Sequence, residues 1–252
     1  MTNKTTPKKN TTTKQNKEKK EIKQITIREF DERFYQRGDE FAPSVTFILD
    51  ATYPSGYGLT KWIGDVGNKR AEEIRDETAE EGSFVHEAIE KMLLGQKISN
   101  EDITSRFIPR RSLKIKRCLK SFIDWYEETE PEIIETEKTI WNDEFLYAGT
   151  LDLKCKINGE IYIIDFKTSN SVQPKMKCQL SAYNYAETNG TAKQAILHLG
   201  NTTKKRYSFI EVDFERYFNQ FLTVKKLFDE LHPNAKPTDE AYPEWFYLQD
   251  KI

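Results

Sequence analysis

The chain has 252 residues, of which 37% are hydrophobic, 32% charged and 12% aromatic, and its formal net charge is -2. This length is enough for one large domain with a sizeable core, and the near-neutral charge does not by itself indicate nucleic-acid binding. The three widely spaced cysteines, Cys118, Cys155 and Cys178, argue against a disulfide framework and a four-cysteine metal cluster. The sequence has no apolar run of about 18 residues and no secretory signal, so we expect no membrane association and a reducing, cytoplasmic location.

Residues 1–24 hold eight lysines against two glutamates and almost no apolar residues. Such a segment cannot offset the entropy of ordering itself, so it is predicted to be a disordered basic tail. It is either a solubilising extension or a weak phosphate-contacting arm. Residues 25–252 are predicted to form a single domain, with a helical part at about 40–130 and a sheet core at about 131–252.

The helical part begins with residues 44–65, which read as a short helical or extended start followed by a Pro/Gly-rich loop. A helical pattern starts at Asn68, and its clearest portion is 82–95, with Ser83 as a plausible N-cap and Gly95 as the stop. A further helix is predicted at about 111–128. Helical spacing of apolar residues supports the portion at 82–95 through Val85, Ile89, Met92 and Leu93.

After Pro131 the periodicity becomes strand-like, at residues 133–141, 145–157, 160–166, 195–200 and 207–214. Helices are expected at about 175–188, ending at Gly190, and at about 215–231. The order of helices, three strands, helix, two strands and helix predicts an α+β fold with a central mixed sheet flanked by helices. No Walker A loop is present, so ATP is not expected as a cofactor.

The pair Asn158-Gly159 predicts a tight hairpin, because both central residues of a type I′ turn need positive φ. With these two residues in the loop, Asp152 lies opposite Asp165 in a non-hydrogen-bonded pair, with Cβ atoms about 4.5–5.5 Å apart. Lys167 shares a face with Asp165. A slip of one residue would send Asp152 to the other face.

Two carboxylates held this close repel each other, and the strand that carries Asp165 is otherwise nearly all apolar. A divalent cation between them would supply the counter-charge, and Mg²⁺ is a hard ion that accepts one or two carboxylates. Lys167 could then stabilise charge in a phosphodiester transition state. The alternative is a surface ion pair between Asp165 and Lys167, with Asp152 as an ordinary strand residue.

The set of Asp152 followed by Asp165-Phe166-Lys167 resembles the bipartite motif of the PD-(D/E)XK nuclease superfamily. Gln179 and Tyr183 resemble the Q-x-x-x-Y pattern of its RecB-like branch, and the segment GSFVHEAIE supplies a histidine motif. Together with the opening PSVTFIL and Lys61-Trp62, these features resemble phage-encoded exonucleases and the mitochondrial genome maintenance exonuclease. The resemblance covers roughly residues 42 to 190.

This resemblance implies a restriction-endonuclease-like core and a metal site that binds Mg²⁺ or Mn²⁺. Its metal ligands would be the side chains of Asp152 and Asp165 and the backbone carbonyl of Phe166. Lys167 would be the catalytic lysine. His86 would be a further side-chain ligand, and Glu137, on the strand before the hairpin, is an additional candidate near the metal.

Around this centre, the resemblance implies that Gln179 and Tyr183 hold DNA or support the site from one helix face, although they could merely cap and pack that helix. Thr168 and Ser169 could bind phosphate or simply end the strand. Two lysines just before the Gln179 helix, Lys175 and Lys177, are either solvated or contact a DNA backbone. Trp62 and Tyr57 are available for base stacking.

The implied activity is that of a metal-dependent DNA exonuclease, hydrolysing phosphodiester bonds by a metal-activated water in recombination, repair or replication. An endonuclease of the same superfamily and a non-catalytic DNA-binding subunit are the alternatives. The expected partners are single-stranded DNA or a duplex end, together with recombination or replication proteins. The sequence departs from the superfamily motif before Asp152, where Thr150-Leu151 stand in place of its proline. The chain also lacks a fourth cysteine, which argues against an iron–sulfur cluster.

Overall fold

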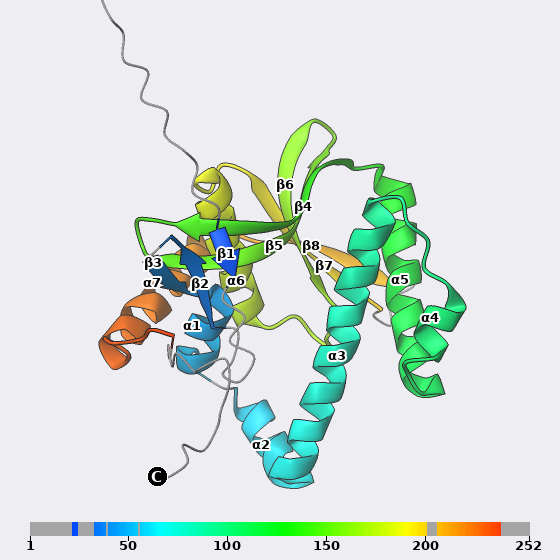
Figure 1. The fold of residues 1–252 in the computed structure, drawn as a ribbon, viewed down its shortest axis with the longest axis horizontal. Helices are drawn as coiled ribbons and strands as arrows, with labels where there is room; N and C mark the ends of the chain where they lie inside the picture. The colour runs from blue at the N-terminus through cyan, green and yellow to red at the C-terminus, as the bar shows by residue number, and fades with distance from the viewer. Residues whose placement is uncertain (1–21, 25–32, 39, 55, 201–205, 238–252) are drawn as a thin grey trace, which may run out of the picture.

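The computed structural model describes residues 22–24, 33–38, 40–54, 56–200 and 206–237. Figure 1 shows a central sheet with helices α3 and α5 on one side and α1, α6 and α7 on the other. The predicted α+β class, with a mixed sheet flanked by helices and preceded by a helical region, is confirmed. In this described part of the chain, no helix combines the length and apolar character needed to cross a membrane.

The central sheet has the strand order β4-β5-β6-β7-β8. Its pairs are antiparallel except β6 and β7, which run parallel and are joined by helix α6. The helix after β8 is α7. The bounds are Glu132–Asn142 (β4), Tyr147–Ile157 (β5), Glu160–Lys167 (β6), Pro174–Thr188 (α6), Lys193–Leu199 (β7), Tyr207–Glu211 (β8) and Phe214–Leu231 (α7). The predicted order of strands and helices after residue 131 is therefore confirmed.

The hairpin between β5 and β6 turns at Asn158 and Gly159, whose φ values are 51° and 86°. Its ladder runs from Ile157↔Glu160 to Leu153↔Ile164, which is the predicted register. Continued by one residue beyond Leu153↔Ile164, this register sets Asp152 opposite Asp165. The turn chemistry therefore fixes which residues of the two strands meet, as expected for an Asn-Gly loop.

Two hydrophobic layers cover the two faces of the sheet. On one face, helices α3 (Asn68–Leu93) and α5 (Pro109–Thr129) pack against strand residues such as Leu153, Ile164 and Phe166. On the other face, α1 (Val45–Thr52), α6 and α7 pack against residues such as Leu151 and Ile163. Both layers are fully buried at their centres, so the sheet is a rigid platform between them.

The helical region differs from its prediction in two places. The expected loop within 44–65 is instead largely helix, because α2 spans Tyr57–Val66 after α1. Helix α3 runs unbroken through residue 82, so Ser83 lies inside it and is not an N-cap. At Gly82 the helix passes close to the residue that follows β6, since an added Cβ would lie 3.4 Å from Thr168 Oγ1. The short α4 (Asn100–Thr104) precedes α5.

A small three-stranded sheet, β1 (Ile22–Gln24), β2 (Phe34–Arg37) and β3 (Glu40–Pro43), was not predicted, because these strands are too short to show periodicity. Tyr35 and Ala42 pack on Ala148 of β5. Residues 22–24, which were predicted to belong to the tail, instead form β1 and pair with β2. Residues 1–21 lie outside the described part of the chain.

Candidate active site

Three side chains from three different elements converge at one edge of the hairpin. His86 of α3, Glu137 of β4 and Asp152 of β5 each offer one donor atom, and these atoms all lie within 4.8 Å of one another. His86 Nδ1 is 3.4 Å from Asp152 Oδ1. One imidazole nitrogen and two carboxylate oxygens form a donor set that suits a divalent cation.

Glu137 reaches this cluster from an irregular point of strand β4. Its neighbours pair as Thr136↔Leu153 and Lys138↔Leu151, so Glu137 lies opposite Asp152, but these two residues are not paired in the ladder. Glu137 has a positive φ of 47°. Thr136 Oγ1 donates a hydrogen bond to the Asp152 carbonyl at 3.1 Å and satisfies that group at the interruption.

Asp152 is buried and held from two sides. Its Oδ2 accepts a 2.6 Å hydrogen bond from the backbone N–H of Phe166, across the hairpin. Burial raises the pKa of Asp152, but the His86 imidazole, the Lys167 ammonium and the Phe166 N–H outweigh burial, so this pKa lies below its usual range. The Asp152 carboxyl is therefore kept ionised next to His86, whose own pKa is raised because Asp152 outweighs the effect of burial.

Asp165 and Lys167 form a buried ion pair beside the cluster, with Lys167 Nζ 2.9 Å from Oδ1 and 2.7 Å from Oδ2 of Asp165. Only 2% of the Asp165 side chain is exposed. Burial and the nearby Asp152 raise the pKa of Asp165 to about 6 against the attraction of Lys167. Oδ2 is buried without a well-directed hydrogen bond, despite the nearby ammonium, so this oxygen retains an unused lone pair.

The Glu137 carboxyl is the least compensated group of the site. Burial, followed by the charge of Asp152, raises the pKa of Glu137 to about 7. No hydrogen bond or ion pair joins this carboxyl to another residue that the structure describes. Because a bound cation would remove this repulsion, the residues present fit a divalent metal ion.

The structure brings some of the site residues predicted from sequence together and leaves others apart. Asp152, His86 and the additional candidate Glu137 are brought together, whereas Asp165 lies outside the three-residue group and is engaged by Lys167. Phe166 contacts the site through its N–H, which binds Asp152. Its ring also packs edge-on to His86, with centroids 5.8 Å apart, and this contact helps to orient the imidazole.

Gln179 and Tyr183 lie under the site and are bonded to each other, with Gln179 Nε2 donating to the Tyr183 hydroxyl at 3.0 Å. A hydrogen bond with the Thr46 side chain also reaches the Tyr183 hydroxyl. The Tyr183 ring is buried against Gly149 of β5, where a Cβ would lie 2.5 Å from Tyr183 Cε1. This placement favours a site-supporting role for Tyr183 over direct contact with a ligand.

The residues that follow Lys167 form hydrogen bonds and packing contacts within the protein. The Ser169 carbonyl accepts a 2.6 Å hydrogen bond from His198 Nε2, and the Ser169 hydroxyl donates to the Ser171 carbonyl. Thr168 lies against Gly82 of α3. The hydrogen bond of the Ser169 hydroxyl would have to break before it could donate to a phosphate.

The two lysines near the start of α6 are engaged as well. Lys175 Nζ lies 2.7 Å from Asp50 Oδ1, and Lys177 lies over the Tyr217 ring, 5.2 Å from its centroid. Of the aromatic residues expected to stack on bases, Tyr57 is 83% exposed, on α2. Trp62 belongs to the same helix and is half-buried.

A cavity of about 400 Å³ opens beside the cluster and is lined by α3 and β4 residues that include Ser83, His86 and Glu137. It also includes Glu87 and Glu90, which sequence reasoning did not single out. Glu90 lies one helical turn after His86 and adds to the charge felt by Glu137. Its i, i+4 spacing from His86 could have identified it.

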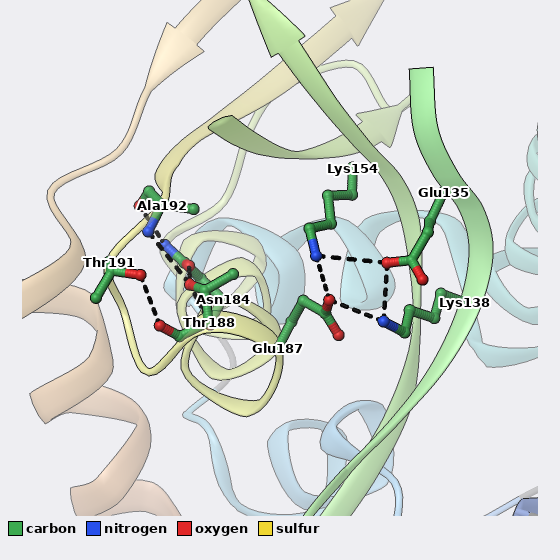
Figure 2. A network of polar contacts seen from close by, with 8 residues as sticks. All are labelled: Glu135, Lys138, Lys154, Asn184, Glu187, Thr188, Thr191 and Ala192. Atoms are coloured by element: carbon green, nitrogen blue, oxygen red, sulfur yellow. Dashed lines mark hydrogen bonds and ion pairs between the residues drawn. The ribbon is translucent and has the colours of Figure 1, made fainter. Parts of the chain in front are cut away.

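A second charged network supports β4 from the other direction. Figure 2 shows Glu187 of α6 between Lys138 and Lys154, at 2.8 and 2.6 Å, with Glu135 completing the group. Only 9% of the Glu187 side chain is exposed. Because Lys138 directly follows Glu137, this network anchors the strand segment that carries the Glu137 carboxyl. No spacing rule in the sequence connects these distant residues.

No family model matches the chain, and no curated protein matches it. Among solved structures, one similar chain is that in the crystal structure of SSO0001, with 18% sequence identity and a TM-score of 0.32. That similarity covers 62% of this chain and 87% of the other.

Proposed function

We propose that this protein is a metal-dependent DNA exonuclease of the PD-(D/E)XK superfamily that hydrolyses phosphodiester bonds. The observation that carries the proposal is the convergence of His86, Glu137 and Asp152 within 4.8 Å, next to the buried Asp165–Lys167 pair. A cation site bordered by a lysine suits phosphodiester hydrolysis, because both positive charges can act on one phosphate.

His86, Glu137 and Asp152 would hold the metal ion. Asp165 Oδ2, which contacts Lys167 Nζ at 2.7 Å, would be a further donor through a remaining lone pair. When bound, Mg²⁺ or Mn²⁺ would polarise a phosphate oxygen and lower the pKa of water. The choice of these ions follows from the carboxylate-rich donor set, since hard cations prefer oxygen ligands.

The protein's own groups divide the remaining work. Lys167 keeps a positive charge, because Asp165 and Asp152 raise its pKa against the effect of burial. This ammonium can stabilise negative charge that develops on a phosphodiester, or hold a water for attack. Asp152 is fixed by the Phe166 N–H, so it does not need to reorganise during the reaction.

DNA as substrate, the exonuclease mode and a role in recombination, repair or replication are supported by the sequence resemblance to phage-encoded exonucleases. A cytoplasmic location, in a host cell if the protein is phage-encoded, belongs to the same proposal. Recombination or replication proteins would be its partners.

The direct test is digestion of 5′- and 3′-labelled single- and double-stranded DNA with Mg²⁺, Mn²⁺ or EDTA. We expect mononucleotides or short oligonucleotides to be released from an end with either ion and none in EDTA. The absence of cleavage with both ions, from a protein that remains folded, would contradict the proposal.

The endonuclease alternative is separated by comparing closed circular DNA with a linear end-labelled substrate of the same sequence. An exonuclease leaves closed circles intact and degrades the linear form. Nicking of circles at the rate seen on linear ends would overturn the exonuclease assignment. The proposal of a metal-dependent nuclease would still stand.

A further inference from the structure

A second cavity, of about 640 Å³, lies between helix α1, helix α3 and the residue that precedes strand β2. It is lined by Arg33, Ser44, Thr46, Phe47, Asp50, Ala51 and Arg75. We propose that this cavity binds a backbone phosphate of the nucleic-acid strand whose end occupies the candidate active site. The inference rests on the proposed function, because it assigns a second contact to the same substrate.

The charge of the cavity favours an anion. Its one carboxyl, Asp50, already lies 2.7 Å from Lys175 Nζ. Because Lys175 pairs with this carboxyl, Asp50 does not oppose an anion at Arg75, whose side chain also lines the cavity. The hydroxyls of Ser44 and Thr46 add polar groups to the same lining. Phosphate is recognised by this combination of guanidinium and hydroxyl groups.

The two arginines of the lining differ in their surroundings. The Arg33 guanidinium lies over the Phe47 ring, 5.0 Å from its centroid, so we assign the phosphate contact to Arg75. Arg75, on α3, is exposed and forms no hydrogen bond or ion pair with another residue that the structure describes. A phosphate at Arg75 would not have to displace a protein carboxylate.

The cavity is connected to the candidate active site through α3 and through Thr46. Arg75 precedes His86 by eleven residues of one helix, which is about 16 Å at about 1.5 Å per residue. A stacked strand covers that span with about five nucleotides, at about 3.4 Å each. Thr46, which lines the cavity, also hydrogen-bonds to Tyr183 below the site. The two places are therefore separated by a distance that one strand can bridge.

Helix α3 also supplies a matched control. Arg70 lies one and a half turns earlier and pairs with Glu73 at 2.9 Å and Glu77 at 3.7 Å. It does not line the cavity. Arg70→Ala and Arg75→Ala therefore remove the same charge from the same helix, and only the second removes it from the proposed phosphate site.

The experiment measures binding of fluorescent oligothymidylates in EDTA, which prevents metal-dependent cleavage, over a range of salt concentrations. The probes are a dinucleotide and an oligomer of about ten nucleotides, about twice the span from His86 to Arg75. We expect Arg75→Ala to weaken binding of the longer probe by about fivefold to tenfold and to lower its log–log salt slope by about 0.7. Binding of the dinucleotide, and all binding by Arg70→Ala, should stay within about twofold of the wild type. Arg75→Gln, which keeps a polar side chain on the helix, should reproduce the result of Arg75→Ala and replaces it if that variant unfolds.

Equal losses in the Arg70 and Arg75 variants, or an Arg75 loss that is the same for both probes, would overturn the phosphate site. Binding of inorganic phosphate that depends on Arg75, without any effect on the longer oligomer, would also overturn it in favour of a free-anion site. A cleavage assay with Mn²⁺ distinguishes failure of the proposed function from failure of the phosphate site. If binding shows the expected length dependence but no DNA is cleaved with Mn²⁺, the phosphate site is supported and the nuclease function is contradicted.

Discussion

Glu137 lies opposite Asp152 across strands β4 and β5, but the ladder is interrupted between them and Glu137 has a φ of 47°. The interruption coincides with the place where the two carboxyls and His86 converge. A non-glycine residue with positive φ is uncommon and costs about 1–3 kcal/mol when the surroundings hold it there. The Glu187 network around Lys138 supplies such surroundings one residue away.

Replacing Glu137 with Gln should change how the stability of the metal-free protein depends on pH. The pKa of Glu137 is raised to about 7 in the folded state from 4.5, so the folded state holds this proton more tightly than the unfolded state does. Stability from this group is complete below about pH 4.5 and is lost as the pH rises toward about 7. The wild type should therefore lose about 1–2 kcal/mol relative to Glu137→Gln over that range, after allowance for solvent screening.

Urea unfolding at stepped pH values in EDTA measures this difference. The same variant should bind Mn²⁺ more weakly than the wild type, and so should gain less stability from added Mn²⁺. A pH-independent difference between the two proteins would show that the Glu137 carboxyl is not destabilised by its surroundings.

Lys167→Met should slow cleavage strongly while the protein stays folded. The Lys167 side chain is only 17% exposed and its ammonium lies beside Asp165. The substitution therefore removes the positive charge that we expect to stabilise the transition state. We expect the rate to fall by about 100-fold to 1,000-fold. Lys156→Met is the matched control on the same hairpin, since Lys156 pairs with Glu132 at the surface. Wild-type turnover of Lys167→Met on end-labelled DNA would show that Lys167 is not the catalytic lysine.

Gly149→Ala should disturb the packing of strand β5 on the Tyr183 ring below the candidate site. The new methyl group would lie 2.5 Å from Tyr183 Cε1 on a buried ring, so either the ring or strand β5 must shift, at a cost of about 1–3 kcal/mol. The melting temperature should fall by about 2–10 °C. Gly64→Ala is the control, because no atom lies within 4 Å of its added Cβ and Gly64 lies inside helix α2. Equal melting temperatures for the two variants would contradict the tight Tyr183 contact.

Glu187→Ala should destabilise the protein more than a surface ion-pair deletion does. It leaves Lys138 and the largely buried Lys154 without their shared carboxylate, which should cost about 1–3 kcal/mol. Glu160→Ala removes an exposed partner of Lys193 and should cost less than about 1 kcal/mol. Denaturant unfolding of both variants measures the contrast, and similar values would mean that the Glu187 network does not hold β4 in place.

The sequence predicted most of the sheet core because its signals there are local and mutually consistent. Asn158-Gly159 determines the hairpin register, Gly190 and its neighbours end α6, and the apolar runs determine the strands. The missed features depend on contacts between distant segments. Helix α3 continues through Gly82, where it passes close to Thr168, and Tyr35 and Ala42 of the small β1–β3 sheet pack on Ala148.

The same distinction applies to the candidate site. The opposition of Asp152 and Asp165 could be calculated from the turn, and an ion pair between Asp165 and Lys167 was the alternative to a metal site. That pair was expected at the surface, whereas it is buried beside the three-residue cluster. The position of Glu137 depends on an irregular strand that no periodicity shows. The roles of these residues in catalysis stay predictions until activity is measured.

The most direct test of the central claim is the Mn²⁺ dependence of end-labelled DNA degradation by the wild type and by Asp152→Asn. This substitution keeps the size of the side chain and removes the charge that His86 and the Phe166 N–H hold in place. We predict that the wild type is inactive in EDTA and regains activity as Mn²⁺ is added, and that Asp152→Asn stays at least about 1,000-fold less active at every Mn²⁺ concentration. Degradation by the wild type in EDTA, or by Asp152→Asn at the wild-type rate, would contradict a metal-dependent nuclease centre at this cluster.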